Sequence, residues 1–270
     1  RSQGRSLARL VCGWVEHPWG VVADDEDESY SARTELYRIV SECEMDMSFE
    51  RAAALALFHG NLELAVSVLR RSVQPPGVVD DEGNGVADDI PQPQHLPESD
   101  VQLMNLVAMC FAGFQNVQAA LEGQHGRAVG RLWLDMCDTV IAQLAARPQR
   151  ATAYLIAACR LLQEIIQSNG GDGSEDVWKY RRVIEEAAIA LEDRIAFACT
   201  YLTDSQLTAF LNSQCSICKL HGNIEGLMIS GLDHQGISLL QQYLDKFNDI
   251  QTVALIAGRV EFPPTMVDDR

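Results

Sequence analysis

Residues 48–69 read Ser48-Phe-Glu-Arg-Ala-Ala-Ala-Leu-Ala-Leu-Phe-His-Gly-Asn-Leu-Glu-Leu-Ala-Val-Ser-Val-Leu69 and predict two short helices. The small residues of the first helix let a neighbouring helix approach closely, and the apolar residues of the second recur at helical spacing. The junction His59-Gly60-Asn61 suits a helix that ends in a left-handed residue and restarts at an asparagine cap. We therefore expect these side chains to be mostly buried between helices: Ala53, Leu57, Leu62, Ala65 and Leu69.

The same pattern recurs downstream. Gly222-Asn-Ile-Glu-Gly-Leu227 echoes residues 60–65, and residues 248–254 form a looser third echo. Helix pairs that repeat along a chain are typical of a stacked helical array. The sequence thus predicts an all-α fold, an α-solenoid of stacked antiparallel helix pairs. The alternative is an ordinary helical domain in which these dipeptides recur by coincidence.

Composition limits the possible functions. The chain has 270 residues, 47% of them apolar, with a net charge of −17 and a pI of about 4.6. An acidic chain is a poor ligand for nucleic acid, because phosphate binding requires a basic face. Direct docking on anionic lipid is disfavoured for the same reason. Much of the acidity lies in residues 24–28 and 80–89.

Cysteine usage favours a reducing compartment. Six of the eight cysteines lie in apolar helical stretches, where they resemble small buried hydrophobic residues: Cys12, Cys43, Cys110, Cys137, Cys159 and Cys199. No signal peptide and no apolar run long enough to cross a membrane is present in the sequence. The first residue is Arg1 rather than Met, so we expect a piece of a longer protein.

Proline, glycine and acidic residues set the expected organisation. We predict one α-solenoid fragment over residues 1–270, with disordered acidic loops near 20–31 and 75–99. A helix is expected from Thr34, and a long one over 175–202. Thr203-Asp204-Ser205 predicts the N-cap of the next helix.

A metal site is the main chemical alternative. Cys215, Cys218 and His221 resemble part of a zinc site, but no second pair of ligands follows them. A cysteine pair on a helix with a histidine near the negative end of its dipole is the simpler interpretation. Residues 80–89 resemble a calcium loop, yet Pro91 stands where a bidentate glutamate is required. We predict no metal ligands and no cofactor.

No catalytic constellation is apparent either. The histidines are not accompanied by a nucleophile elbow, a zinc-protease motif or a phosphate loop. We interpret Glu185-Glu186 and Glu192-Asp193 as solvated faces and His59 as a capping or packing residue. The sequence therefore predicts a protein that is not an enzyme, with no catalytic residues.

Several segments together resemble the helical region of the Missing oocyte (Mios) family. They cover nearly the whole chain except its acidic loops and occur in the family's order: Leu10-Val-Cys-Gly-Trp-Val15, Phe49-Glu-Arg-Ala-Ala-Ala-Leu-Ala-Leu-Phe58, Leu103-Met-Asn-Leu-Val-Ala-Met109, Leu132-Trp-Leu-Asp-Met-Cys137, Asp193-Arg-Ile-Ala-Phe-Ala-Cys199, Gly222-Asn-Ile-Glu-Gly-Leu227 and Asp249-Ile-Gln-Thr252. The long loop 75–97 departs from the shorter family linker and resembles a lineage insertion. The family has no Cys-x-x-Cys at the positions of Cys215 and Cys218.

The resemblance implies a function. Mios-like proteins carry an N-terminal WD-repeat propeller, an α-solenoid and a C-terminal RING-like zinc domain. We expect this piece to correspond to the solenoid without the two flanking domains. They are subunits of the SEA complex, called GATOR in animals, in the subcomplex that promotes TOR kinase signalling when amino acids are plentiful. The implied partners are other subunits, including WD-repeat propeller proteins. The implied location is cytoplasmic, at the vacuolar or lysosomal membrane surface, without membrane insertion.

Two alternatives to this function stay open. One is a helical-repeat scaffold of a vesicle-coat or nuclear-pore assembly. The other is an all-α metal protein that uses Cys215, Cys218 and His221. For a scaffold, we expect exposed apolar surface near Leu10, Trp14 and Val15 or in residues 253–260.

Overall fold

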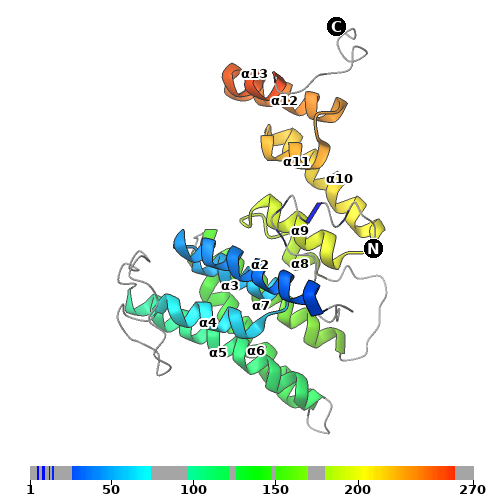
Figure 1. Cartoon of the computed structure of the whole chain (residues 1–270). Helices are drawn as coiled ribbons and strands as arrows, with labels where there is room; N and C mark the ends of the chain where they lie inside the picture. The colour runs from blue at the N-terminus through cyan, green and yellow to red at the C-terminus, as the bar shows by residue number, and fades with distance from the viewer. Residues whose placement is uncertain are drawn as a thin grey trace. The chain divides into compact units, whose positions relative to one another are not determined.

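The computed structural model describes residues 26–73, 97–121, 126–147, 150–169 and 180–258, with Arg5, Ala8, Arg9, Cys12 and Trp14. Every regular element in these ranges is a helix, and none of them contains a strand (Figure 1). The predicted all-α class is therefore confirmed. The calcium-like segment 80–89 and most of the predicted loop 75–99 lie outside the described residues.

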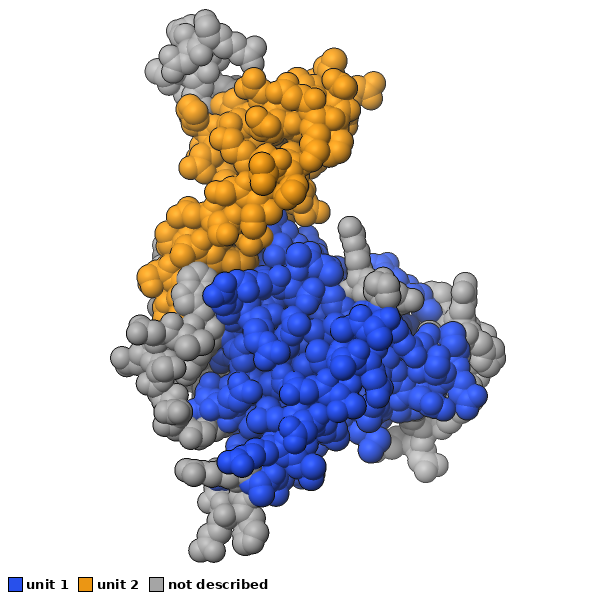
Figure 2. Space-filling view, turned by 180° about the vertical axis from the view of Figure 1, so that it is seen from behind, with its two compact units in different colours: residues 1–201 blue, residues 202–270 orange. Residues whose placement is uncertain are grey.

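The chain divides into two compact units, Arg1–Tyr201 and Leu202–Arg270, which are coloured separately in Figure 2. Each unit is considered by itself below. That both units belong to one continuous solenoid stays a prediction.

Unit 1 contains the predicted helical hairpin of residues 48–69. It consists of α3 (Phe49–Phe58) and α4 (Leu62–Val73), which pack against each other. Residues 52 to 58 of α3 are all buried, so this helix is enclosed on every side. The predicted burial is confirmed for Ala53, Leu57, Leu62, Ala65 and Leu69.

The Gly-Asn echo is a real structural repeat. Gly60 and Gly222 both have a positive φ, of 84° and 61°, which an L side chain adopts only at a cost. The asparagine after each glycine accepts a backbone N–H at the next helix start, from Leu64 for Asn61 and from Glu225 for Asn223. At the third echo Asn248 is left-handed, with a φ of 54°, and ends a helix. The dipeptide therefore sets the turn between helices in both units.

The second helical layer of unit 1 begins with two long neighbours in Figure 1, α5 (Glu98–Leu121) and α6 (Gly126–Ala145). Their contacts show an antiparallel register. The Cys110 thiol meets that of Cys137, and a Cβ added at Gly130 would lie 3.3 Å from Leu121. The next helix, α7 (Arg150–Asn169), packs on α5, α6 and α3.

The contact between α7 and α3 brings residues about 100 positions apart together, and it makes α7 the central helix of unit 1. Its residues 152–159 are all buried. Small side chains at Ala153, Ala157 and Ala158 permit this close approach. The helix α7 therefore connects the hairpin of α3 and α4 to the pair α5 and α6.

Two predicted boundaries are wrong. The helix expected from Thr34 is α2 (Glu26–Met45), so residues 26–31 are helical rather than part of a disordered loop.

The predicted helix over 175–202 is also wrong in its described part. It is interrupted between α8 (Arg181–Ile184) and α9 (Leu191–Tyr201). The backbone groups released by the break bind distant side chains. Arg160 donates to the Arg182 carbonyl (3.1 Å), and the Ala190 N–H donates to the hydroxyl of Tyr154 (3.3 Å). Because α7 supplies these partners, the interruption costs few hydrogen bonds.

Unit 2 begins at the cap that the sequence predicts. Thr203 and Gln206 form a reciprocal capping box at the start of α10. The described elements of this unit are α10 (Asp204–His221), η1 (Ile224–Gly226), α11 (Leu227–Ser230), α12 (His234–Phe247) and α13 (Ile250–Ala257).

Glycine permits the closest contacts in unit 2. A Cβ added at Gly226 would lie 2.5 Å from the Cβ of Cys218, and one at Gly236 would lie 2.0 Å from the Gly231 carbonyl oxygen. Helices here approach through backbone rather than through large interlocking side chains. Within the described helices, none is long and apolar enough to span a lipid bilayer.

The packing of α3 gives a first prediction. Ala53→Glu should lower the free energy of unfolding by on the order of 3 kcal/mol, because it places an unpaired charge in a fully buried helix contact. Ala112→Glu is the matched control, since Ala112 is exposed on α5 and the change should stay within about 0.5 kcal/mol. Urea unfolding monitored by circular dichroism measures both; equal effects would contradict the packing described here.

Candidate functional site

A buried carboxylate, Asp193, connects four segments of unit 1. Its side chain is 1% exposed at the start of α9. It accepts hydrogen bonds from the Tyr154 hydroxyl (2.6 Å), Arg51 Nε (2.9 Å) and Trp14 Nε1 (3.3 Å). These donors come from α7, α3 and the N-terminal segment. A carboxylate so enclosed is stable only because several donors replace its water.

Arg51 supplies the compensating positive charge. Its Nη2 also donates to the more exposed Glu192 (2.9 Å), so one guanidinium holds two consecutive carboxylates. Burial acts to lower the pKa of Arg51, but the Asp193 charge and hydrogen bond raise it by more. Burial and the nearby Asp193 charge raise the pKa of Tyr154, which therefore stays a neutral hydrogen-bond donor at pH 7.

Aromatic rings enclose this network. Trp14 stacks on Phe58 (5.9 Å between centroids) and lies 4.6 Å from the His59 ring, and Phe197 meets Phe58 edge to face. Tyr201 stacks on Phe197, and its hydroxyl donates a hydrogen bond to the Phe58 carbonyl (2.6 Å). The cluster keeps water away from Asp193, which strengthens its hydrogen bonds.

His59 is a packing residue at the end of α3, as the sequence predicts. Its Nδ1–H donates to the Leu55 carbonyl (2.7 Å), and its ring is buried beside Trp14. Burial lowers the pKa of His59 to about 4. The ring is therefore neutral near pH 7.

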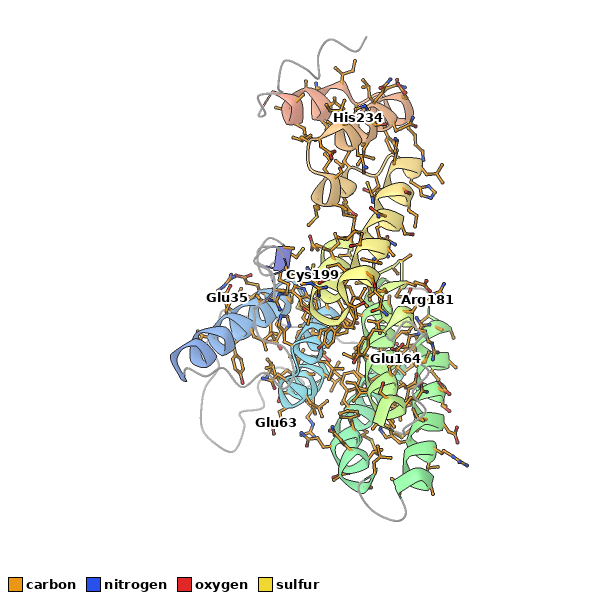
Figure 3. The ribbon with its side chains drawn as sticks, turned by 90° about the vertical axis from the view of Figure 1, so that its right-hand side faces the viewer. Glu35, Glu63, Glu164, Arg181, Cys199 and His234 are labelled. Atoms are coloured by element: carbon orange, nitrogen blue, oxygen red, sulfur yellow. The ribbon has the colours of Figure 1, made fainter. Side chains whose placement is uncertain are left out.

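The N-terminal segment is held at two described positions. The guanidinium of Arg5 donates a hydrogen bond to the carbonyl oxygen of Cys199 (3.1 Å). Cys199 belongs to α9 and is labelled in Figure 3. Trp14 is 3% exposed, so the expectation that it belongs to leftover apolar surface is wrong. Its indole N–H pairs with Asp193 and its ring fills the gap between α3 and α9. Leu10 and Val15 lie outside the described residues.

Large apolar side chains are exposed in both units, for example Met109 and Leu132 in unit 1 and Leu255 in unit 2. Of these, Leu255 lies in the predicted segment 253–260. The helix α13 reads Ile-Gln-Thr-Val-Ala-Leu-Ile-Ala, carries no charge and has no buried residue. Ile250 and Leu255 are 69% and 66% exposed, and Phe247 at the end of α12 is 54% exposed. Single exposed apolar side chains are common, but a helix that leaves apolar residues exposed around its axis is a candidate contact surface. Ile250 and Leu255 lie about 140° apart around α13. We call Phe247, Ile250 and Leu255 the α13 surface.

The three residues of the zinc-like motif do not form a metal-binding group in the described structure. Cys218 is buried under Gly226, Cys215 lies 3.4 Å from the amide oxygen of Gln235, and His221 is exposed at the helix end. In the part of the chain that the structure describes, no three His, Cys, Asp or Glu side chains are placed to hold a metal ion.

Sequence reasoning missed Asp193. The interpretation of Glu192-Asp193 as a solvated face is wrong for Asp193, which is buried. Glu192 is more exposed, but it forms an ion pair with Arg51. A signal was available: Asp193 shares a helix with the apolar run 195–199, so it faces the core at helical spacing. The pairing with Arg51 has no local signal, since 142 positions separate the two.

Comparison with known proteins identifies the fold family. The family model described as MIOS, alpha-solenoid matches residues 1–201, which end where unit 1 ends. The chain is similar to the GATOR2 complex protein MIOS of Danio rerio, at 27% identity over 253 residues, and to that of Dictyostelium discoideum, at 25% over 265 residues. It is also 26% identical over 253 residues to the SEH-associated protein 4 of Saccharomyces cerevisiae.

The alignments cover nearly all of this chain but only a small part of each relative. The alignments include 94%, 96% and 94% of this chain but 22%, 20% and 18% of the respective relatives. The chain thus spans about a fifth of their length. The predicted solenoid architecture and the Mios resemblance are confirmed by the family match.

The buried network gives a second prediction. Asp193→Asn should cost on the order of 3 kcal/mol of unfolding free energy, because it leaves Arg51 as a half-buried charge without its buried partner. Glu192→Gln is the matched control: it removes a neighbouring carboxylate from the same arginine, but an exposed one, and should cost less than about 1 kcal/mol. Urea unfolding at pH 7 measures both; a larger loss for Glu192→Gln would contradict this assignment.

The buried histidine gives a third prediction. The folded pKa of His59, about 4, lies below its ordinary value of 6.5, so below pH 6.5 the unfolded state binds more protons. Stability is therefore lost as the pH falls from 6.5 towards 4. Between pH 7 and pH 5 the wild type should lose about 2 kcal/mol more than His59→Gln, which keeps a donor for Leu55. Urea titrations at both pH values test this, and parallel losses in both proteins would rule it out.

Proposed function

We propose that this chain, which belongs to the MIOS α-solenoid family, is a non-catalytic scaffold in a GATOR2- or SEA-type complex. The family match over residues 1–201 is the observation that carries the proposal. The relatives in Danio and Dictyostelium are named as GATOR2 complex proteins, and the yeast relative as a SEH-associated protein. An all-helical unit with a rigid buried network suits a part that holds other subunits in position.

A finer function follows from the family resemblance. We infer that the complex promotes TOR kinase signalling in response to amino acids and acts in the cytoplasm, at the surface of the vacuole or lysosome. The proposed partners are other subunits of the complex, including WD-repeat propeller proteins, and no nucleic acid. The net charge of −17 supports the exclusion of nucleic acid, because no excess of basic residues is available for phosphates.

The α13 surface is the part of the described structure best suited to subunit contact. Its helix α13 carries no charged residue, and interface cores are depleted in charge in the same way. The junction before it is rigid, since Asp249 accepts from the Thr252 N–H (3.1 Å) and from the Tyr243 hydroxyl (2.9 Å). A preordered surface loses little conformational entropy when a partner binds.

A fourth prediction tests this assembly role. Leu255→Asp in the full-length protein should reduce co-purification of the other subunits at least tenfold, because a charge in the centre of an apolar contact is costly. Gln241→Asp is the matched control, as it adds the same charge to an exposed polar position of α12, away from Leu255. Both proteins should keep wild-type helical content by circular dichroism. Equal recovery of subunits with Leu255→Asp and wild type would exclude the α13 surface from assembly.

A further inference from the structure

Three cysteine thiols meet in the interior of unit 1. Cys110 on α5, Cys137 on α6 and Cys159 on α7 are each 0% exposed. The sulfur atoms of Cys110 and Cys137 lie 3.0 Å apart, and all three thiols are free. The expectation that these cysteines are small buried residues is confirmed. Their convergence from three helices is an additional feature, which packing alone does not require.

The three thiols are not equivalent. Either sulfur of the Cys110–Cys137 contact can be the donor. Hydrogen bonding with Cys137 and Cys159 lowers the pKa of Cys110 against the opposing effect of burial. The same interactions raise the pKa of Cys137 and of Cys159. We therefore take Cys110 as the attacking thiol and Cys137, whose sulfur lies 3.0 Å away, as its partner.

The surrounding structure fixes the register of this pair. The Trp133 indole N–H donates to the Cys110 carbonyl (3.1 Å), which locks α6 against α5. The same ring packs next to Gly113, where an added Cβ would make an ordinary van der Waals contact at 3.5 Å. A disulfide requires sulfur atoms about 2.0 Å apart, so an approach of about 1 Å is sufficient.

We propose that Cys110 and Cys137 are an oxidisable thiol pair that hydrogen peroxide converts to a disulfide between α5 and α6. The Cys110 thiolate attacks one peroxide oxygen, the O–O bond breaks, and hydroxide leaves with a sulfenic acid formed on Cys110. The Cys137 sulfur then attacks the sulfenic sulfur, the S–O bond breaks, and water leaves with the thiol proton. The two thiols lose two electrons, and one peroxide becomes two waters.

Burial determines which oxidants react. No described atom of the pair is exposed, so a reagent must enter during local opening of the α5–α6 contact. Hydrogen peroxide is close to water in size, whereas a peptide disulfide is not. The disulfide would then hold α5 and α6 together and favour the folded state by restricting the unfolded chain. This inference does not depend on the proposed scaffold function.

Peptide mapping tests the proposal directly. The 270-residue chain is treated with hydrogen peroxide, its remaining thiols are blocked with iodoacetamide, and it is digested with trypsin. Cleavage at arginine places each cysteine on its own peptide, 72–127 for Cys110, 132–150 for Cys137 and 151–160 for Cys159. Mass spectrometry should find a crosslink between the first two peptides that dithiothreitol reverses. It should be at least tenfold more abundant than any crosslink of Cys43, which is also buried and is the single cysteine of peptide 39–51.

Variants sharpen the result. Cys137→Ala should abolish the crosslink and leave a Cys110 sulfenic acid that dimedone traps, whereas Cys43→Ala should leave the crosslink unchanged. The oxidised wild type should unfold at a temperature higher by about 5 °C or more. A chain that keeps its helical content in peroxide but gives no crosslink between Cys110 and Cys137 would overturn the proposal, and so would a crosslink between Cys110 and Cys159 instead. If Cys137→Ala does not fold, the peptide map of the oxidised wild type still shows whether Cys110 and Cys137 are crosslinked.

Discussion

The buried carboxylate of Asp193 is the constraint on which unit 1 depends. It binds Trp14, Arg51 and Tyr154, which lie 179, 142 and 39 positions away in the sequence. Helices of a solenoid mostly contact their neighbours along the chain, so their order is local. The buried charge of Asp193 requires donors from α3, α7 and the N-terminal segment. These segments must therefore be folded at the same time as α9.

The sequence allowed the local features to be predicted. The hairpin of residues 48–69, its buried side chains and the Gly-Asn turns follow from helical spacing and from the residue needed at a left-handed position. The cap at Thr203 follows in the same way. Each depends on residues within one or two helical turns, which a periodic pattern records.

The features that sequence reasoning missed are those fixed by distant partners. The break between α8 and α9 contains no proline or glycine, and it is stabilised by Tyr154 and Arg160 from α7. The burial of Trp14 and of Asp193 depends on their pairing with each other across the unit. A single sequence without relatives to compare gives no signal for such pairs. The contact between α3 and α7 was missed for the same reason, because about 100 positions separate the two helices.

Hydrogen exchange tests the role of Asp193 most directly. Backbone amide exchange of the wild type and of Asp193→Asn is measured by mass spectrometry at pH 7, and the two are compared helix by helix. If the carboxylate couples the segments, exchange in the variant rises together in α3, α7 and α9 and around Trp14, while α13 is unchanged. An increase confined to α9 would show that Asp193 stabilises only its own helix, which would contradict the account.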